Sequence, residues 1–195
     1  MKTTKKALLL ALCAVLLVVS TVFATMAYLT STTKMVKNTF TVGKVVITLD
    51  EAKVDEYGVE ENGASRVTEN TYKLMPGHTY VKDPTIHVDA ESEDCWLFVS
   101  IVDEIAAIQD VTTVEAQMRS NGWLPLEGNV WYYKNVVEGG EDVPVFKYFT
   151  VKGDANVADY NGKTITVIGY AVQADGFNYA SDAWAAAPSD WTPAT

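Results

Sequence analysis

The pattern of apolar and polar positions divides the chain into an apolar N-terminal run and a long stretch of alternating residues. The run 7–24 is apolar except for Ser20 and Thr21, and a polar spacer follows it. Beyond the spacer, apolar residues occupy every second position at Val45, Ile47 and Leu49. Because such alternation is typical of a half-buried strand, the folded part is predicted to begin with a strand over 44–49.

The same alternation, together with turn residues, predicts further strands. They cover 72–75, 79–88, 95–102, 123–124, 130–134, 143–151 and 163–173. Pro76 and Gly77 predict a type II turn, because Pro fixes φ at the second turn position and Gly supplies the positive φ of the third. Pro84 cannot donate to a ladder, so it predicts an edge, a strand start or a bulge. The polar, acidic stretch 50–70 predicts a long loop or a ragged hairpin.

Helical patterns are few. Thr112 and Glu115 form a capping box that predicts a helix start, and Gly122 suits the left-handed position after the helix end. A short helix over 181–187, capped by Ser181, and one helical turn within 153–162 are also expected. About eight strands with short turns and one clear short helix predict an all-β fold, an antiparallel β-sandwich.

The N-terminus has the pattern of a signal peptide over 1–27. Three lysines precede the apolar run, and Thr25-Met26-Ala27 places small residues at the −3 and −1 positions, so cleavage is expected between Ala27 and Tyr28. An uncleaved anchor is the alternative, because the run is about as long as the ~17 residues that can just span a bilayer. Residues 28–38, rich in Thr and Ser and without periodicity, predict a free N-terminal arm before a domain over 39–195.

The length and the net charge of the chain limit its domain count and the partners that it can bind. Removing 27 of 195 residues leaves 168, the size of one domain. The signal peptide carries three of the 15 basic residues and none of the 25 acidic ones, so 12 basic residues remain and the net charge is −13. Such a surface repels nucleic acid and anionic lipid headgroups. Nucleic acid is therefore not expected as a partner, and membrane contact is expected only through an uncleaved signal segment.

Candidate chemistry is sparse. Cys95 is the one cysteine beyond the signal peptide, so no internal disulfide can form, and its acidic neighbours raise rather than lower the pKa of the thiol. His78 and His87 are the only histidines and lack the spacing of a zinc protease. Acid pairs such as Asp89 and Glu91 offer oxygen ligands to calcium, with a solvated acidic turn as the alternative. No catalytic, metal or cofactor residue is assigned. Twelve of the 21 aromatic residues, all between Trp96 and Trp191, are expected mostly in the core, and 131–133 is the place where they could form a carbohydrate platform.

Several short segments carry a family resemblance. They are Ala27-Tyr28-Leu29-Thr30, residues 38–43, Leu74-Met75-Pro76-Gly77, Lys82-Asp83-Pro84, and the strand 165–173 with Gly176-Phe177. In these segments the chain resembles the TasA and camelysin family of secreted proteins with a SipW-type signal peptide. The resemblance implies a jelly roll, processing by a dedicated signal peptidase, a secreted or cell-surface location, and a role in the biofilm matrix. It also implies a camelysin-like metalloprotease as an alternative.

The leading hypothesis is an exported structural protein, a subunit or accessory of an extracellular fibre that associates with itself or with related matrix proteins. A camelysin-like protease and a carbohydrate-binding surface module are the alternatives. Assembly is expected to proceed by strand addition, because an unpaired strand edge is a template for another chain. The apolar side chains of the arm would supply register, at Tyr28, Leu29, Met35, Val36 and Phe40. The core is expected to include Val45, Ile47, Leu97, Val99, Ile165 and Val167.

Overall fold

The structure is a computed structural model that describes residues 5–7, 11–17, 43–189, 191, 193 and 194. It divides into two units, residues 1–41 and 42–195. In the first unit, residues 5–7 and 11–17 are helical, and no helix of the described residues is both long and apolar enough to cross a membrane. The predicted cleavage site at Ala27 and Tyr28 and the arm to Phe40 lie outside the described residues.

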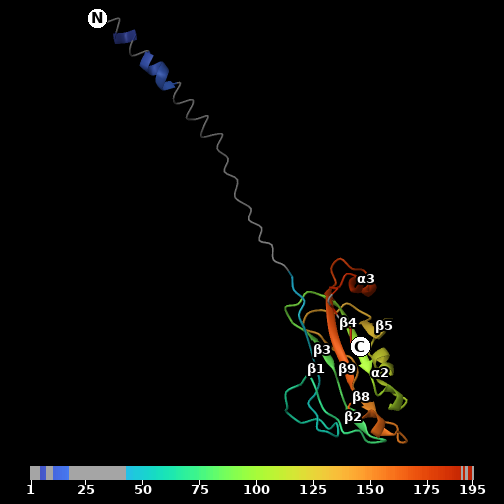
Figure 1. The fold of residues 1–195 in the computed structure, drawn as a ribbon. Helices are drawn as coiled ribbons and strands as arrows, with labels where there is room; N and C mark the ends of the chain where they lie inside the picture. Colours follow the sequence, from blue (N-terminus) through green and yellow to red (C-terminus); the bar gives the residue numbers. More distant parts are fainter. Residues whose placement is uncertain (1–4, 8–10, 18–42, 190, 192, 195) are drawn as a thin grey trace. The chain divides into compact units, whose positions relative to one another are not determined.

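The second unit is an antiparallel β-sandwich (Figure 1). Its strands are β1 (Ile47–Asp50), β2 (Thr79–Val81), β3 (Thr85–Val88), β4 (Cys95–Asp103), β5 (Trp123–Glu127), β6 (Val130–Tyr133), β7 (Asp142–Pro144), β8 (Tyr148–Thr150) and β9 (Ile165–Gln173). Its helices are η1 (Ala106–Ile108), α2 (Val114–Ser120), η2 (Val157–Tyr160) and α3 (Ala180–Ala185). The predicted all-β sandwich is confirmed, whereas the jelly-roll order stays a prediction.

The strands form three sheets. One layer is the four-stranded sheet β5-β6-β4-β9, and the other holds the three-stranded sheet β1-β3-β7 and the pair β2-β8. The longest pairing joins β4 to β9 over nine residues, from Cys95 opposite Gln173 to Asp103 opposite Ile165. Every strand pair is antiparallel.

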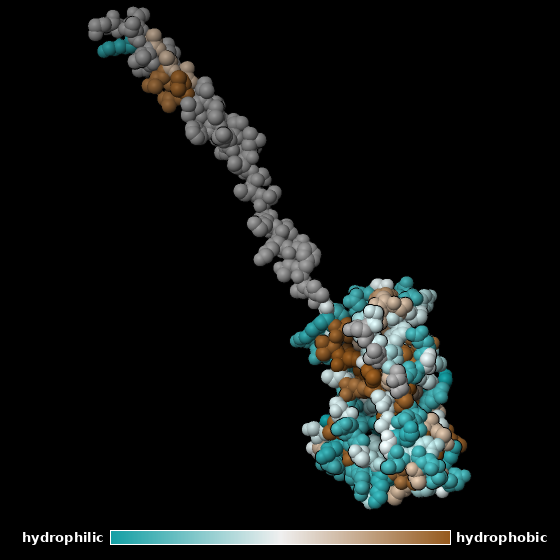
Figure 2. Space-filling view, in the orientation of Figure 1, coloured by the Kyte–Doolittle hydropathy of each residue, from teal (hydrophilic) through white to brown (hydrophobic). Residues whose placement is uncertain are grey.

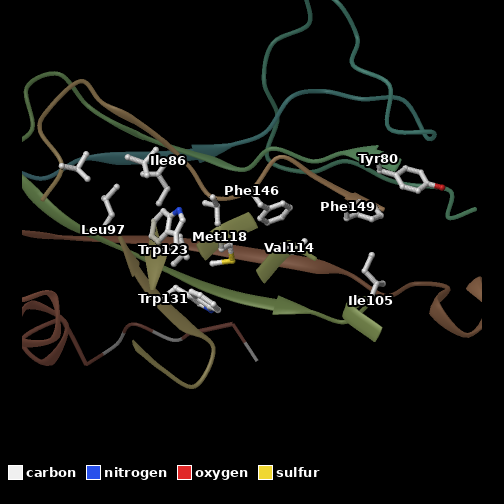
Figure 3. Close-up of a cluster of buried hydrophobic side chains, with 14 of the residues drawn as sticks. Tyr80, Ile86, Leu97, Ile105, Val114, Met118, Trp123, Trp131, Phe146 and Phe149 are labelled. Carbon is white, nitrogen blue, oxygen red and sulfur yellow. The ribbon is translucent and has the colours of Figure 1, made fainter. Parts of the chain in front are cut away.

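The main core lies between the two layers, and Figure 3 shows Ile86, Leu97 and Trp123 pointing into it. Leu97 and Val99 of β4 face this core and are fully buried. Between them, Phe98 points to the opposite face, where it packs with Trp184 of α3 in a second, smaller cluster. Both faces of β4 are therefore covered, as its apolar sequence predicts.

Four of the six predicted core residues are only half-buried. Leu97 and Val99 are enclosed, but Val45, Ile47, Ile165 and Val167 pack against the core with part of their surface in solvent. The difference has a positional cause. β1 and β9 are edge strands of their sheets, so their inward side chains have neighbours on one side only.

Turns follow the local sequence closely. The type II turn is confirmed: the His78 amide donates to the Met75 carbonyl at 3.3 Å, and Gly77 has φ +75°. The prediction of a strand over 72–75 is wrong, because two backbone groups of this segment bond to the Tyr80 hydroxyl rather than to a neighbouring strand. That hydroxyl accepts from the Met75 amide and donates to the Lys73 carbonyl. The segment 79–88 divides at Pro84 into β2 and β3, which belong to different sheets.

Helix starts differ from prediction by one or two residues. The N-cap of α2 is Thr113, whose hydroxyl accepts from the Ala116 amide at 3.2 Å. The Glu115 carboxylate accepts a hydrogen bond from Arg119 instead of bonding the amide of the cap residue. The predicted capping box of Thr112 and Glu115 is therefore wrong. Gly122 follows the helix end with φ +96°, as predicted. Ser181 lies inside α3, which has Tyr179 at its N-cap and no side-chain cap.

Candidate strand-docking edge

The outer edge of β9 is long and unprotected. Its nine residues contain neither a charged residue nor a proline. The Glu104 amide donates to the Thr164 carbonyl, and the Ala174 amide donates to the Asp94 carbonyl. Even-numbered residues therefore turn their main-chain groups towards β4, and the odd-numbered ones turn theirs outwards. No strand in the described part of the chain pairs with this outer side.

A second free edge lies on β1. The Asp89 amide donates to the Val46 carbonyl, so even-numbered residues of this strand face β3. Glu51 and Val67 exchange two hydrogen bonds of 2.8 Å on the opposite side, which closes the end of that edge. The main-chain groups of Ile47 and Leu49 consequently face outwards, and no described strand pairs with them.

The two free edges adjoin along an incompletely covered apolar strip, here called the β1–β9 seam. It consists of Val45, Ile47, Leu49, Ile165, Val167 and Ala171, all half-buried and packed against the main core. Gly169 lets the layers come close, because a Cβ there would lie 3.3 Å from Ile86 Cδ1 and 3.6 Å from Ile47 Cδ1. Figure 2 shows hydrophobic residues gathered on the face over β1, β3 and β9.

One end of the seam opens into a cleft of about 1200 Å³. Leu49 forms its wall on the β1 side, and Ile165 and Val167 form its wall on the β9 side. Segments 68–74 and 157–164 add tyrosine, asparagine, lysine and threonine side chains to the lining, and Glu51 and Lys82 also line it. The cleft therefore combines apolar walls beside a free strand edge with polar side chains that can hydrogen-bond a main chain.

The opposite edges of the two larger sheets, on β5 and β7, carry protective features. β5 contains Pro125 and Glu127, with a register shift between them. β7 contains Asp142 and Pro144. Proline, charge and bulges are the usual means by which an edge strand avoids pairing with another chain. Among the edges of the two larger sheets, this contrast singles out the β1–β9 side as the one open to strand addition, whereas the strands of the β2–β8 pair are only three residues long.

A charged network holds β1 in place. His87 of β3 lies between two carboxylates: Nδ1 is 2.6 Å from Asp142 Oδ1, and Nε2 is 2.9 Å from Asp50 Oδ1. Burial disfavours the imidazolium, but the hydrogen bonds to Asp142 and Asp50 outweigh it and raise the pKa of His87. Arg66 adds bonds of 2.5 Å to Asp50 and 2.8 Å to Asp83. Burial also opposes charge on Asp50, yet Arg66 and His87 lower the pKa of this carboxyl.

The histidines are engaged in structural contacts. The two ring nitrogens of His87 point to carboxylates on opposite sides, so these groups do not converge on one point. His78 contacts the Tyr57 carbonyl through Nε2 at 2.8 Å. Within the described ranges no group of three His, Cys, Asp or Glu residues is placed to hold a metal ion. The metalloprotease alternative thus finds no ligand set there.

Two smaller predictions are decided by burial. Cys95 is fully buried, and burial together with Asp94 and Glu141 raises the pKa of its thiol to about 11, in the direction that its acidic neighbours predict. The prediction of an exposed aromatic platform at 131–133 is wrong. Trp131 is 7% exposed, and the Arg119 guanidinium lies 4.9 Å from its ring centre. Alternation along β6 sends its neighbours Tyr132 and Tyr133 to different clusters.

The sequence predictions missed the free β9 edge, although nine residues without charge or proline were available as an indication. The arm residues proposed to add to an edge, from Tyr28 to Phe40, lie outside the described part of the chain. Comparison with known proteins adds no further constraint. No protein-family model, curated protein or solved structure matches this chain. The function is therefore argued from the edge and the cleft.

Proposed function

We propose that this protein is an exported structural subunit or accessory of an extracellular fibre, and that it assembles by strand addition at the β1–β9 side. The single observation that carries the proposal is the uncharged, proline-free outer edge of β9. A globular domain that functions alone has reason to protect such an edge. The signal-peptide pattern supports export, and the resemblance to the TasA and camelysin family supports a jelly-roll fold and a place in the biofilm matrix.

The N-terminal arm of a neighbouring chain has suitable length and chemistry for this edge. Extended residues span about 3.3 Å each, so β9 is about 30 Å long and the arm from Tyr28 to Phe40 reaches about 43 Å. The arm can therefore cover the whole edge with residues to spare. Its main chain would bond the outward groups of β9, and side chains such as Leu29 and Met35 would complete the seam.

Such an interface is heterologous, because the arm of one copy meets the edge of the next. A head-to-tail contact that does not close on itself produces a filament. Signal cleavage would act as a switch in this scheme, since an arm still joined to the apolar run 7–24 is not free to reach a neighbour.

The proposal is tested by placing a charge in the edge. In the chain beginning at Tyr28, Val167→Lys puts an inward-pointing ammonium beside the outward amide of β9, where an added strand would have to bury it. This variant is expected to stay monomeric by light scattering and electron microscopy, while the parent chain forms filaments that depend on concentration.

Leu124→Lys is the matched control, because it adds the same charge to the protected β5 edge at a residue that is already 38% exposed. It should assemble like the parent chain. Circular dichroism and denaturant unfolding verify that both variants are folded. Filaments from Val167→Lys at the parent's concentration, or a parent chain that stays monomeric, would contradict the proposal.

A further inference from the structure

Glu51 holds a lysine and an asparagine on the two oxygens of one carboxylate. Lys82 Nζ lies 2.6 Å from Oε2, and Asn70 Nδ2 donates to Oε1 at 2.9 Å. Glu51 follows β1, Asn70 ends the long loop, and Lys82 follows β2, so the fold brings together three distant segments. An amine and a carboxamide are thus positioned on either side of a group that can accept and donate a proton.

The glutamate and the lysine of this cluster are largely withdrawn from solvent, and Asn70 is half-buried. Glu51 is 3% exposed, and the Lys82 side chain is 12% exposed. The comparable pairs Lys53–Glu61 and Lys163–Glu104 have lysine side chains that are 47% exposed. Among the ion pairs of the described residues, only Lys82–Glu51 also holds a side-chain amide. Burial and the charge of Glu51 also raise the pKa of the neighbouring Tyr72, in keeping with a site of low polarity.

The Asn70 amide is held in one orientation. Its Oδ1 accepts from the Val54 amide at 3.1 Å, and its Nδ2 donates to the Ala52 carbonyl at 2.8 Å as well as to Glu51. If the amide were flipped, Nδ2 would face the Val54 N–H, and Oδ1 would face the Ala52 carbonyl and the Glu51 carboxylate, so these hydrogen bonds would be lost. The Val54 N–H therefore points at the atom on which negative charge would develop if the amide carbon were attacked.

We propose that Lys82 and Asn70 become joined by an intramolecular isopeptide bond, with Glu51 as the catalytic acid and base. Glu51 first takes a proton from the Lys82 ammonium. The neutral amine then attacks Asn70 Cγ, the carbonyl electron pair moves to Oδ1, and the Val54 N–H stabilises the oxyanion.

Proton transfer through Glu51 completes the step. The carboxyl gives its proton to Asn70 Nδ2 and takes one from Lys82 Nζ; the Cγ–Nδ2 bond breaks as the carbonyl re-forms, and ammonia departs. Glu51 finally passes its proton to the ammonia and returns to the carboxylate. One ammonium and one carboxamide thereby become a secondary amide and an ammonium ion, with no other reactant. The cleft, which Glu51, Asn70 and Lys82 line, gives the ammonia an exit to solvent.

Peptide mass spectrometry of the purified full chain tests the bond. After denaturation and digestion, the peptides that contain Asn70 and Lys82 should appear as one branched species, lighter than their sum by one ammonia. Lys82→Arg keeps the positive charge beside Glu51 but should abolish the branch, and Glu51→Gln should reduce it by a factor of ten or more.

Glu61→Gln is the matched control, because it removes a carboxylate from a pair in the same loop that holds no asparagine. This variant should retain the branched species in full. Separate, unmodified peptides from the folded parent chain would overturn the proposal, whatever the variants do. So would a loss of ammonia at Asn70 that persists in Lys82→Arg, because it would identify cyclisation of the asparagine alone. Filament formation has no bearing on this result.

Discussion

At the scale of single residues, an apolar side chain stabilises the sandwich according to the surface that it removes from water. Leu97 is fully enclosed between the layers, whereas Ile165 lies on the seam and keeps part of its surface in solvent. Leu97→Ala should therefore lower the free energy of unfolding by about 3 to 5 kcal/mol, and Ile165→Ala by about 1 to 2 kcal/mol. Urea unfolding of the two variants measures both values. Equal losses would contradict the assignment of Ile165 to an open edge.

His87 gives the stability of the sandwich a dependence on pH. Its pKa is raised in the folded chain, above the value of about 6.5 expected when unfolded. Its contribution is therefore complete below that unfolded value and is lost as the pH rises through the folded pKa. The difference in unfolding free energy between the parent chain and His87→Gln should be largest below about pH 6 and should decline as the pH rises above about 6.5 and through the raised pKa of the folded chain.

Asp142→Asn provides the matched check on this cause. It removes the negative charge beside Nδ1 and leaves Asp50 in place, so the decline should move to lower pH. The effect is modest because the His87 and Asp142 side chains are 28% and 67% exposed. A stability difference that is independent of pH would show that His87 acts through packing rather than through charge.

At the scale of elements, local sequence patterns correctly predicted those strands, turns and helix ends that depend on neighbouring residues alone. The strand Cys95–Asp103, the turn at Gly77 and the helix end at Gly122 follow from alternation and from glycine's access to positive φ. The cap of α2 was displaced because two adjacent threonines can serve, and only Thr113 directs its hydroxyl to the Ala116 amide. The strand predicted over 72–75 was wrong because the Tyr80 side chain bonds the Met75 amide and the Lys73 carbonyl, a contact that alternation does not predict.

Local sequence patterns could not predict the order in which strands pair or which residues far apart in the sequence come together. The sequence of β9 does not indicate that, among the described strands, it pairs with β4 alone. Its free edge could therefore be recognised only from the order of the strands in the sheet. The partial exposure of Ile47 and Val167 has the same origin. Likewise, Glu51 and Lys82 are 31 residues apart, and Asn70 joins them only once the loop 51–70 has folded against β1. Alternation assigns a residue to a face, but the surroundings of that face depend on the whole chain.

At the scale of the whole molecule, the sandwich is asymmetric. One side carries proline, charge and a bulge on β5 and β7. The other presents the bare edge of β9 and the partly closed edge of β1 beside an apolar seam and a cleft. This asymmetry favours association on one side only and gives an assembly a direction. The central claim is that the outer edge of β9 is the acceptor for an arm.

Amide-resolved hydrogen exchange tests that claim most directly. An isotope-labelled chain beginning at Thr39 would be measured by NMR with and without a peptide of residues 28–40. The peptide should slow exchange at the outward amides of Ile165, Val167, Gly169 and Ala171, while the even-numbered amides, already bonded to β4, stay as they were. A peptide in which Leu29, Met35 and Val36 are replaced by serine should protect them less. Unchanged exchange at the odd-numbered amides under saturating peptide, or protection at the β5 edge instead, would contradict the account.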